Sequence, residues 1–315
     1  MNNRQMEYFV RIAELGSFRR ASESLRIAQP ALTRHIKNLE ADLGVELFNR
    51  RSDGVVLTSA GGLLLERARV ILRQTQQARA DVMAHGTVPS GSVGFGAPPS
   101  IAQMLFGPLA AAYQSSYPQV LLRFQDGVGH LFDWLVNEEI DLAILPSSRL
   151  TETRSFCRKP LVSEPVYVVG APGRLPLGRE CGVADVTALP LVLTPAPSTV
   201  RSWLDELVRA DGHTLQVVAE TESSQVQKDL VRAGLGFAVL PHSAVHRDHE
   251  AGLVDLCQVR HWRLSRVLAW RNDRPLTPAV REMIRMTEAL VQELFEDGAF
   301  GPAEAVPAPL GRLVG

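Results

Sequence analysis

The sequence predicts an α/β protein preceded by a small, mostly helical domain, and three patterns support this. From Val93 to about Gly298, short apolar segments alternate with amphipathic ones, which is typical of strands and helices in largely parallel sheets. Before residue 59, short helical segments separated by tight turns end in a hairpin signal. Between these parts a helical period continues without a break. We expect a winged helix-turn-helix domain over residues 1–58, a linker helix over 59–86 and an α/β domain over 87–300.

Composition is ordinary for a globular protein. Of the 315 residues, 45% are apolar and 21% are charged, and no stretch approaches the ~20 apolar residues that span a bilayer. The N-terminal segment carries charges inside its apolar run, so we expect no signal peptide and a cytoplasmic location. The three cysteines, Cys157, Cys181 and Cys257, are widely spaced and odd in number, which indicates free thiols.

Charge is distributed unevenly along the chain. The first 90 residues hold thirteen basic and nine acidic side chains, whereas the remainder holds twenty basic and twenty-five acidic ones. A basic N-terminal module on an acidic body suggests that the module binds a polyanion such as DNA. The excess is modest, so the motif must carry this interpretation.

The N-terminal helices have clear start and stop signals. A first helix is expected over Gln5–Leu15, with Gly16 at its end. Ser17 is a suitable cap for a short second helix, Phe18–Leu25. After a three-residue turn, a proline at position 30 suits the first turn of a third helix, which should end before Gly44. Two helices joined by a tight turn form the helix-turn-helix pattern.

The third helix has one apolar and one polar face. At ~100° per residue, a narrow stripe expected to face the core contains Leu32, Ile36, Leu39 and Leu43. The adjoining polar arc contains Gln29, Pro30, Thr33, Arg34, Lys37 and Asn38. Amide and guanidinium groups suit base edges, and hydroxyl and ammonium groups suit phosphates. For an isolated helix, a solvated polar face is the commoner explanation, so the context decides.

A hairpin signal follows the third helix. Ser52-Asp53-Gly54 is a turn sequence between two short extended segments, so we expect a β-hairpin wing. Arg50 and Arg51 lie at the edge of this wing, where they can reach backbone phosphate or the minor groove. Pairing with a nearby acidic residue explains either arginine equally well.

These residues together resemble the DNA-binding domain of LysR-type transcriptional regulators, continuously over about residues 4–62. The matching positions are Ala21, Leu25, Gln29–Thr33, Ile36, Leu39-Glu40, Leu43-Gly44, Leu47-Phe48, Arg50, Leu57-Thr58 and Gly61. The resemblance implies that side chains matching Gln29, Thr33 and Arg34 face DNA and that the wing arginines contact its backbone. With Pro30 and the more variable Lys37, the candidate DNA-binding set is Gln29, Pro30, Thr33, Arg34, Lys37, Arg50 and Arg51.

The linker helix carries an apolar seam spaced four and three residues apart. Its members are Leu64, Ala68, Ile71, Thr75, Ala78 and Val82. Such a seam would be exposed on a lone helix, so it indicates a partner helix, although packing against its own domain is the alternative. The resemblance implies a homodimer through this helix and a homotetramer that grips promoter DNA with paired wings. RNA polymerase is a further partner that the resemblance suggests.

The second half resembles the family's effector domain more loosely. The landmarks are Gly91–Gly96, Tyr117-Pro118, Asp141–Ile144 and Gly234–Pro241. The resemblance implies two Rossmann-like subdomains of the periplasmic-binding-protein type, with a small-molecule effector between them whose binding alters DNA bending. We expect subdomain I over about 91–161 and 267–298, subdomain II over about 162–266, and a disordered tail over 301–315. Among branches of the family, the sequence is most similar to the nitrogen-assimilation regulators.

Several strand-to-helix junctions carry hydroxyl or small residues at the helix start. Converging helix N-termini form an anion site that suits a carboxylate effector. The candidate effector-binding residues are Ser100, Gly129, His130, Ser198, Thr199 and Ser223. Serine and threonine at such positions are more often plain helix caps. Glu222 does not favour an anion, which leaves the charge of the effector open.

Other chemistries have little support. The glycine pairs near residues 94–96 and 234–236 lack the rest of a dinucleotide motif, and no catalytic motif occurs, so we expect neither an enzyme nor a cofactor. His242, His246 and His249 have the spacing of one helix face, but no cysteine lies near them, so we expect no metal site. A regulator controlled by its own abundance or by a protein partner, without a small ligand, remains the alternative.

Overall fold

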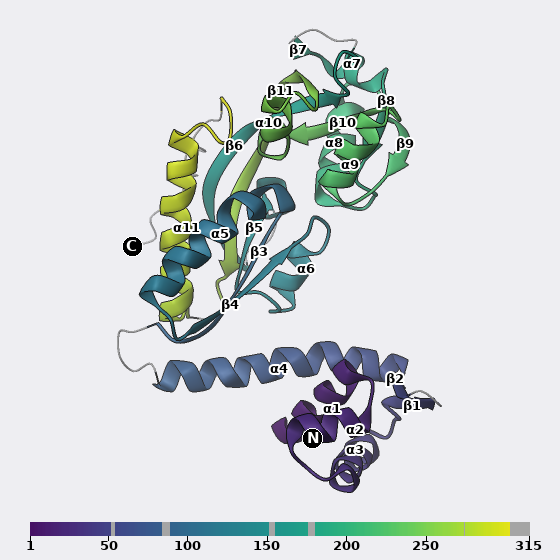
Figure 1. Cartoon of the computed structure of the whole chain (residues 1–315), viewed down its shortest axis with the longest axis vertical. Coiled ribbons are helices and arrows are strands. Elements are labelled where there is room, and N and C mark those ends of the chain that lie inside the picture. Colours follow the sequence, from purple (N-terminus) through teal and green to yellow (C-terminus); the bar gives the residue numbers. More distant parts are fainter. Residues whose placement is uncertain (52–53, 84–88, 151–154, 176–179, 274, 303–315) are drawn as a thin grey trace. The chain divides into compact units, whose positions relative to one another are not determined.

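The computed structural model describes residues 1–51, 54–83, 89–150, 155–175, 180–273 and 275–302 (Figure 1). They divide into two compact units, Met1–Gly86 and Thr87–Gly315. None of the described helices is long and apolar enough to cross a membrane.

The N-terminal unit is a helical bundle with a two-stranded wing. Gly16 and Gly44 end two of its helices with left-handed backbone angles (φ 61° and 70°), as the sequence predicted, and Ser17 caps the second helix by accepting the Arg20 amide. The wing strands pair antiparallel, with Phe48 opposite Leu57. The elements are α1 Asn3–Leu15, α2 Phe18–Leu25, α3 Gln29–Leu43, β1 Phe48–Arg51, β2 Gly54–Leu57 and α4 Ser59–Met83.

The core of this unit is built on the predicted stripe of α3, with one exception. Leu32, Ile36 and Leu39 are fully buried against α1, but Leu43 is 38% exposed. The prediction that Leu43 faces the core is therefore wrong. It lies in the last turn of α3, immediately before the cap at Gly44, and this turn extends past the core.

The apolar seam of α4 packs against the core of its own unit. Ala68 is fully buried, and Leu64 and Ile71 pack against the same core. The Thr75 hydroxyl accepts a hydrogen bond from Asn3 Nδ2 at 3.0 Å. The alternative that this stretch packs on its own domain therefore holds from Leu64 to Thr75. The side chains of Ala78 and Val82 lie outside the described residues.

The C-terminal unit is built on one mixed sheet. The described strands follow the order β4-β3-β5-β11-β6-β10-β8-β9, and β7 pairs with β11. The strands are β3 Gly91–Ala97, β4 Val120–Asp126, β5 Leu142–Pro146, β6 Phe156–Gly170, β7 Glu180–Cys181, β8 Pro190–Leu193, β9 Gln216–Glu220, β10 Phe237–Pro241 and β11 Asp255–Arg271. The helices are α5 Pro99–Ser116, α6 Leu131–Val136, the 3-10 turn η1 Ser147–Leu150, α7 Val183–Thr187, α8 Thr199–Ala210, α9 Ser224–Arg232, α10 His242–Glu250 and α11 Pro278–Glu296.

Two long antiparallel strands, β6 and β11, connect two subdomains (Figure 1). On β6, Val162 belongs to the core under α5 and α11, whereas Val166 belongs to the core under α8. On β11, the corresponding change lies between Leu264 and Val267. Each subdomain has helices on both faces of its part of the sheet, which is the α/β architecture that the sequence predicted.

The sequence underestimated these two strands and the antiparallel content of the sheet. In the sequence, the apolar runs at residues 166–169 and 267–270 predict strands, and nothing predicts that these strands continue beyond them. In the structure both strands also cross between the subdomains, through segments that contain serine, arginine and glutamate. Polar residues interrupt the apolar pattern in these crossings, so periodicity did not extend the strands through them.

Candidate DNA-binding surface and effector cavity

The start of α3 presents the predicted DNA-facing residues to solvent. Gln29, Pro30, Arg34 and Lys37 are exposed, and Thr33 is half-buried. The Thr33 hydroxyl donates to the Gln29 carbonyl at 3.0 Å, a bond within the helix that holds this side chain against the backbone. Exposed amide, guanidinium and ammonium groups on one helix face are the chemistry that base edges and phosphates accept.

Two surface grooves flank this face of α3. One groove is lined by Thr33 and Lys37 on the helix side and by Phe48 and Asn49 of the wing. The other groove is lined by Pro30, Arg34 and Asn38, with two neighbouring α3 residues. Asn49 is an exposed amide at the wing that the sequence did not single out. The side chains of Arg50 and Arg51 lie outside the described residues.

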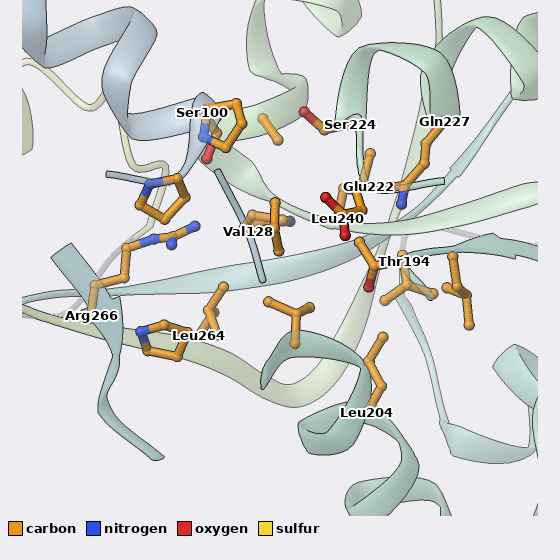
Figure 2. Close-up of a pocket in the computed structure, with 18 of the residues that line it drawn as sticks. Ser100, Val128, Thr194, Leu204, Glu222, Ser224, Gln227, Leu240, Leu264 and Arg266 are labelled. Atoms are coloured by element: carbon orange, nitrogen blue, oxygen red, sulfur yellow. The ribbon is translucent and has the colours of Figure 1, made fainter. Parts of the chain in front are cut away.

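A cavity of about 70 Å³ lies between the two subdomains, where the carboxyl end of β3 faces those of β8 and β10 (Figure 2). Most of its lining is apolar, and both subdomains contribute. Subdomain I supplies Pro98, Pro99, Ser100, Val128, Leu131 and Pro146. Subdomain II and the connecting strand supply Leu193, Thr194, Val200, Leu204, Glu222, Ser224, Gln227, Val239, Leu240, Pro241, Ala244, Leu264 and Arg266.

A buried polar network borders this cavity. Arg266 on β11 and Glu164 on β6 are 2% and 0% exposed, and Arg266 Nε donates to Glu164 Oε1 at 2.8 Å. The other carboxylate oxygen accepts the Ser243 amide at 2.7 Å, at the start of α10. Ser243 Oγ lies 3.1 Å from Glu164 Oε1 and 3.3 Å from Ser100 Oγ. The network therefore joins both crossing strands to one helix start in each subdomain.

Glu222 is the second charged side chain among the described lining residues. It is exposed at the edge of the cavity, and a Cβ placed on Gly129 of the facing subdomain would lie 3.7 Å from its Oε1. Figure 2 shows the Arg266 guanidinium and the Glu222 carboxylate entering the cavity from different sides. In the described part of the chain these two groups form no ion pair with each other.

The predicted effector-binding residues are divided among several places. Ser100 lines the cavity. Gly129, Ser198 and Thr199 line a separate outer groove of about 370 Å³ between α6 and α8. The His130 ring packs near that of Trp134, with 5.9 Å between their centroids.

Two of these serines also cap helices. Ser198 Oγ accepts the Arg201 amide at 3.2 Å, and Ser223 Oγ accepts the Val226 amide at 3.3 Å. Both serines therefore cap helices, which is the alternative that the sequence left open. Ser223 does not line the cavity, but the next residue, Ser224, does.

Sequence reasoning missed Glu164 and Arg266. Glu164 stands between the apolar runs of β6, and Arg266 directly precedes the apolar run of β11. A charge so close to a buried run signals a partner, because an unpaired charge is costly to bury. The sequence did not reveal that the two residues pair with each other, since that depends on the register of β6 and β11.

Two cysteines that are distant in sequence come together. The Cys181 and Cys257 thiols interact within the core of subdomain II, although the sequence offered no nearby pair. Burial raises the pKa of Cys181 to about 12, and it also raises the pKa of Cys257. Because the thiolate is the reactive form, both groups are poorly suited to redox sensing.

In comparisons with known proteins, each of the two units matches a known family domain. Residues 3–62 match the helix-turn-helix domain of the lysR family of bacterial regulatory proteins, and residues 86–292 match the LysR substrate binding domain. The nitrogen assimilation regulatory protein nac of Escherichia coli (strain K12) is 33% identical over 246 residues, which cover 78% of this chain and 79% of that protein.

Solved structures show the same fold. The crystal structure of CbnR, a LysR family transcriptional regulator, has a TM-score of 0.68 at 21% identity and covers 92% of this chain and 99% of that one. Full-length CbnR complexed with its target DNA has a TM-score of 0.66 at 21% identity, over 93% of this chain and 99% of that one. The chain therefore belongs to the LysR family and is a DNA-binding transcriptional regulator with an effector-binding domain, not an enzyme.

Proposed function

We propose that this regulator reads promoter DNA with the start of α3 and the wing, and that an effector in the cavity between its subdomains modulates the DNA complex. The DNA-binding residues in this proposal are Gln29, Pro30, Thr33, Arg34, Lys37, Arg50 and Arg51. The domain division is a winged helix-turn-helix over 1–58, the linker helix over 59–86 and the effector domain over 87–300. The DNA-binding role also supports the proposal that the protein is cytoplasmic.

The proposed roles follow from side-chain chemistry. Gln29 offers an amide that can pair with adenine, and Arg34 offers a guanidinium group for guanine. Lys37 and the wing arginines suit phosphates, which give affinity without sequence information. Exposure of the α3 residues supports this assignment.

We also propose that the chain forms a homodimer through α4. The seam from Leu64 to Thr75 is used within the unit, so the dimer requires another face of the helix. Leu63 is 60% exposed, and Val70 lies seven residues further on the same face and is half-buried. An exposed leucine that shares a helix face with a half-buried valine supports a partner helix there. A homotetramer and a contact with RNA polymerase rest on the family resemblance.

The observation that carries the effector role is a buried arginine at a cavity lined by both subdomains. Arg266 lies at the point where β11 crosses between them, and its guanidinium group points into the cavity (Figure 2). A ligand held there contacts both subdomains and so favours one relative arrangement over others. Arginine suits planar anions, so we propose that the effector carries a carboxylate group.

A second candidate is a regulator that uses no small ligand and is controlled by its abundance or by a protein partner. The cavity volume favours it: about 70 Å³ is well below the ~300–1,000 Å³ of common ligand sites. An effector larger than a few heavy atoms would require the subdomains to separate first.

A thermal-shift screen of the full chain against small carboxylates distinguishes these candidates. A ligand at ~100 times its Kd should add ~2.7 kcal/mol to the free energy of unfolding. Ser100→Ala, at the cavity, should diminish the shift, whereas Ser202→Ala, at the outer groove, should leave it unchanged. A true effector should also change the affinity of the chain for promoter DNA. A complete blank would favour the second candidate.

A further inference from the structure

We propose that the effector is a small α-amino acid in its zwitterionic form, with its carboxylate at Arg266 and its ammonium group at Glu222. The inference rests on the proposed function, because it names the chemical class of ligand for the same cavity.

In this proposal, Arg266 and the start of α5 bind the carboxylate group of the ligand. Arg266 uses its Nε–H for Glu164, and its terminal amino groups point into the cavity (Figure 2). At the start of α5, the amides of Ile101 and Ala102 donate to the Pro98 carbonyl at 2.9 Å. Since Pro99 has no N–H, the Ser100 amide is the donor that remains in this first turn for a ligand oxygen.

Glu222 binds the ammonium group of the ligand in this proposal. This carboxylate points into the cavity and forms no ion pair among the described residues. It lies close to Gly129, where the absence of a side chain leaves access from the facing subdomain. A ligand ammonium group placed beside it gains a charge-assisted hydrogen bond.

Charge balance selects a ligand with both groups. Glu164 neutralises Arg266, so the cavity with Glu222 carries a net negative charge. A plain carboxylate would add a second negative charge without relieving Glu222. A plain amine would relieve Glu222 but would leave the terminal amino groups of Arg266 without an acceptor. A zwitterion satisfies both ends and leaves the total charge unchanged.

Size and polarity restrict the rest of the ligand. The rest of the cavity lining is mostly apolar and includes Val128, Leu131 and Leu240. The volume of about 70 Å³ is roughly half that of the ~150 Å³ cavity that accepts benzene, a molecule with as many non-hydrogen atoms as L-alanine, so the subdomains must separate to admit even this ligand. The side chain of the amino acid must therefore be short and apolar, and alanine is the natural probe.

The test is calorimetric titration of the full chain with three matched compounds. L-Alanine carries both charged groups, propionate lacks the ammonium group and ethylamine lacks the carboxylate. We expect L-alanine to bind about ten-fold more tightly than either of the others. L-Leucine, which needs a larger cavity, should bind more weakly. Propionate binding as tightly as L-alanine, or no binding by any protein amino acid, would overturn the proposal.

A pair of exposed-acid variants locates the ammonium site. Glu222→Gln should weaken L-alanine about ten-fold, and it should not weaken propionate, whose repulsion from Glu222 it removes. Glu250→Gln, an exposed acid on α10 of the same subdomain, should change neither affinity. Equal effects of the two variants would contradict the assignment of Glu222.

The outcomes also separate this inference from the proposed function. If L-alanine fails but another carboxylate binds in a Ser100-dependent manner and alters DNA affinity, the proposed function stands and the amino-acid assignment falls. If L-alanine binds as expected but DNA affinity does not change, the ligand class stands and the effector role falls.

Discussion

Glu164 and Arg266 form an ion pair at the crossing between the two subdomains, with Arg266 Nε 2.8 Å from Glu164 Oε1 and neither side chain more than 2% exposed. They lie on the two strands that connect the subdomains, and the pair also holds Ser243 at the start of α10. Two desolvated charges are tolerated here because each has the other and because the carboxylate accepts further hydrogen bonds.

Removing one partner of this pair should destabilise the effector domain strongly. Arg266→Met leaves a buried, unpaired carboxylate, so we expect a loss of ~3–5 kcal/mol in the free energy of unfolding. Removing both charges with Glu164→Gln and Arg266→Met should recover much of that loss. All four tryptophans lie in this unit, so tryptophan fluorescence during urea unfolding reports on it alone. Lys159→Met, at an exposed ion pair with Glu288, is the control and should cost less than ~1 kcal/mol. A small effect of Arg266→Met would show that the charge is not buried.

Gly61 and Gly62 should respond differently to a single methyl group. A Cβ on Gly61 would lie 2.2 Å from the Leu47 carbonyl oxygen, whereas a Cβ on Gly62 has nothing within 4 Å. Gly61→Ala must therefore displace α4 from the wing and should weaken DNA binding by more than ten-fold. Gly62→Ala should bind DNA at least as well as the parent, since alanine favours the helix. Fluorescence anisotropy with labelled DNA measures both variants, and equal affinities would contradict the close contact at Gly61.

The dimer proposal predicts a specific effect at Leu63. Leu63→Asp should dissociate the dimer, because it places a charge on the face of α4 that Leu63 and Val70 share. Leu253→Asp changes a comparably exposed leucine outside α4 and should leave the assembly intact. Sedimentation velocity gives the mass of each species. A Leu63→Asp chain that remains dimeric would place the interface elsewhere.

The effector domain should lose stability in mild acid through His242. Burial, followed by repulsion from His246, lowers the pKa of His242 below its ordinary value of 6.5, although Glu164 and Glu250 oppose this. The remaining neighbours are His249, whose charge also lowers the pKa, and the ring of Tyr167. The folded state then binds fewer protons than the unfolded state, so stability is fully present above pH 6.5 and falls as the pH drops below it.

The His242→Phe variant tests this pH dependence. Nδ1 of His242 is buried without a hydrogen-bond partner among the described residues, so phenylalanine sacrifices no bond there. Melting temperatures at pH 7.5 and 5.5 should differ less in the variant than in the parent. An unchanged difference would assign the acid sensitivity to other groups.

The sequence predicted the DNA-binding unit more fully than the cavity, and the reason is physical. Helix ends such as Gly16 and Gly44 are set by local backbone preferences, and the comparisons confirm the family resemblance that these residues carried. The four-and-three spacing of the apolar seam in α4 is the same whether the seam packs against another subunit or against its own core. The spacing alone therefore could not predict that Ala68 packs in the core of its own unit.

The cavity depends on contacts between distant segments. Ser100 was found because it begins a helix after a strand, which is a local signal. Glu164 and Arg266 are separated by 102 positions, and only the register of two long strands brings them together. No local pattern encodes that register, so the charge of the cavity could not be predicted.

The most direct test of the account is selection of DNA from a random pool by the full-length chain, followed by affinity measurements at fixed salt concentration. We predict an enriched motif with two half-sites related by two-fold symmetry. Gln29→Ala should lose ~1–3 kcal/mol of preference at particular bases, whereas Arg50→Ala should weaken all sequences about equally. No enriched motif, or a Gln29→Ala variant that selects the same motif with the same preference, would contradict direct readout by the start of α3.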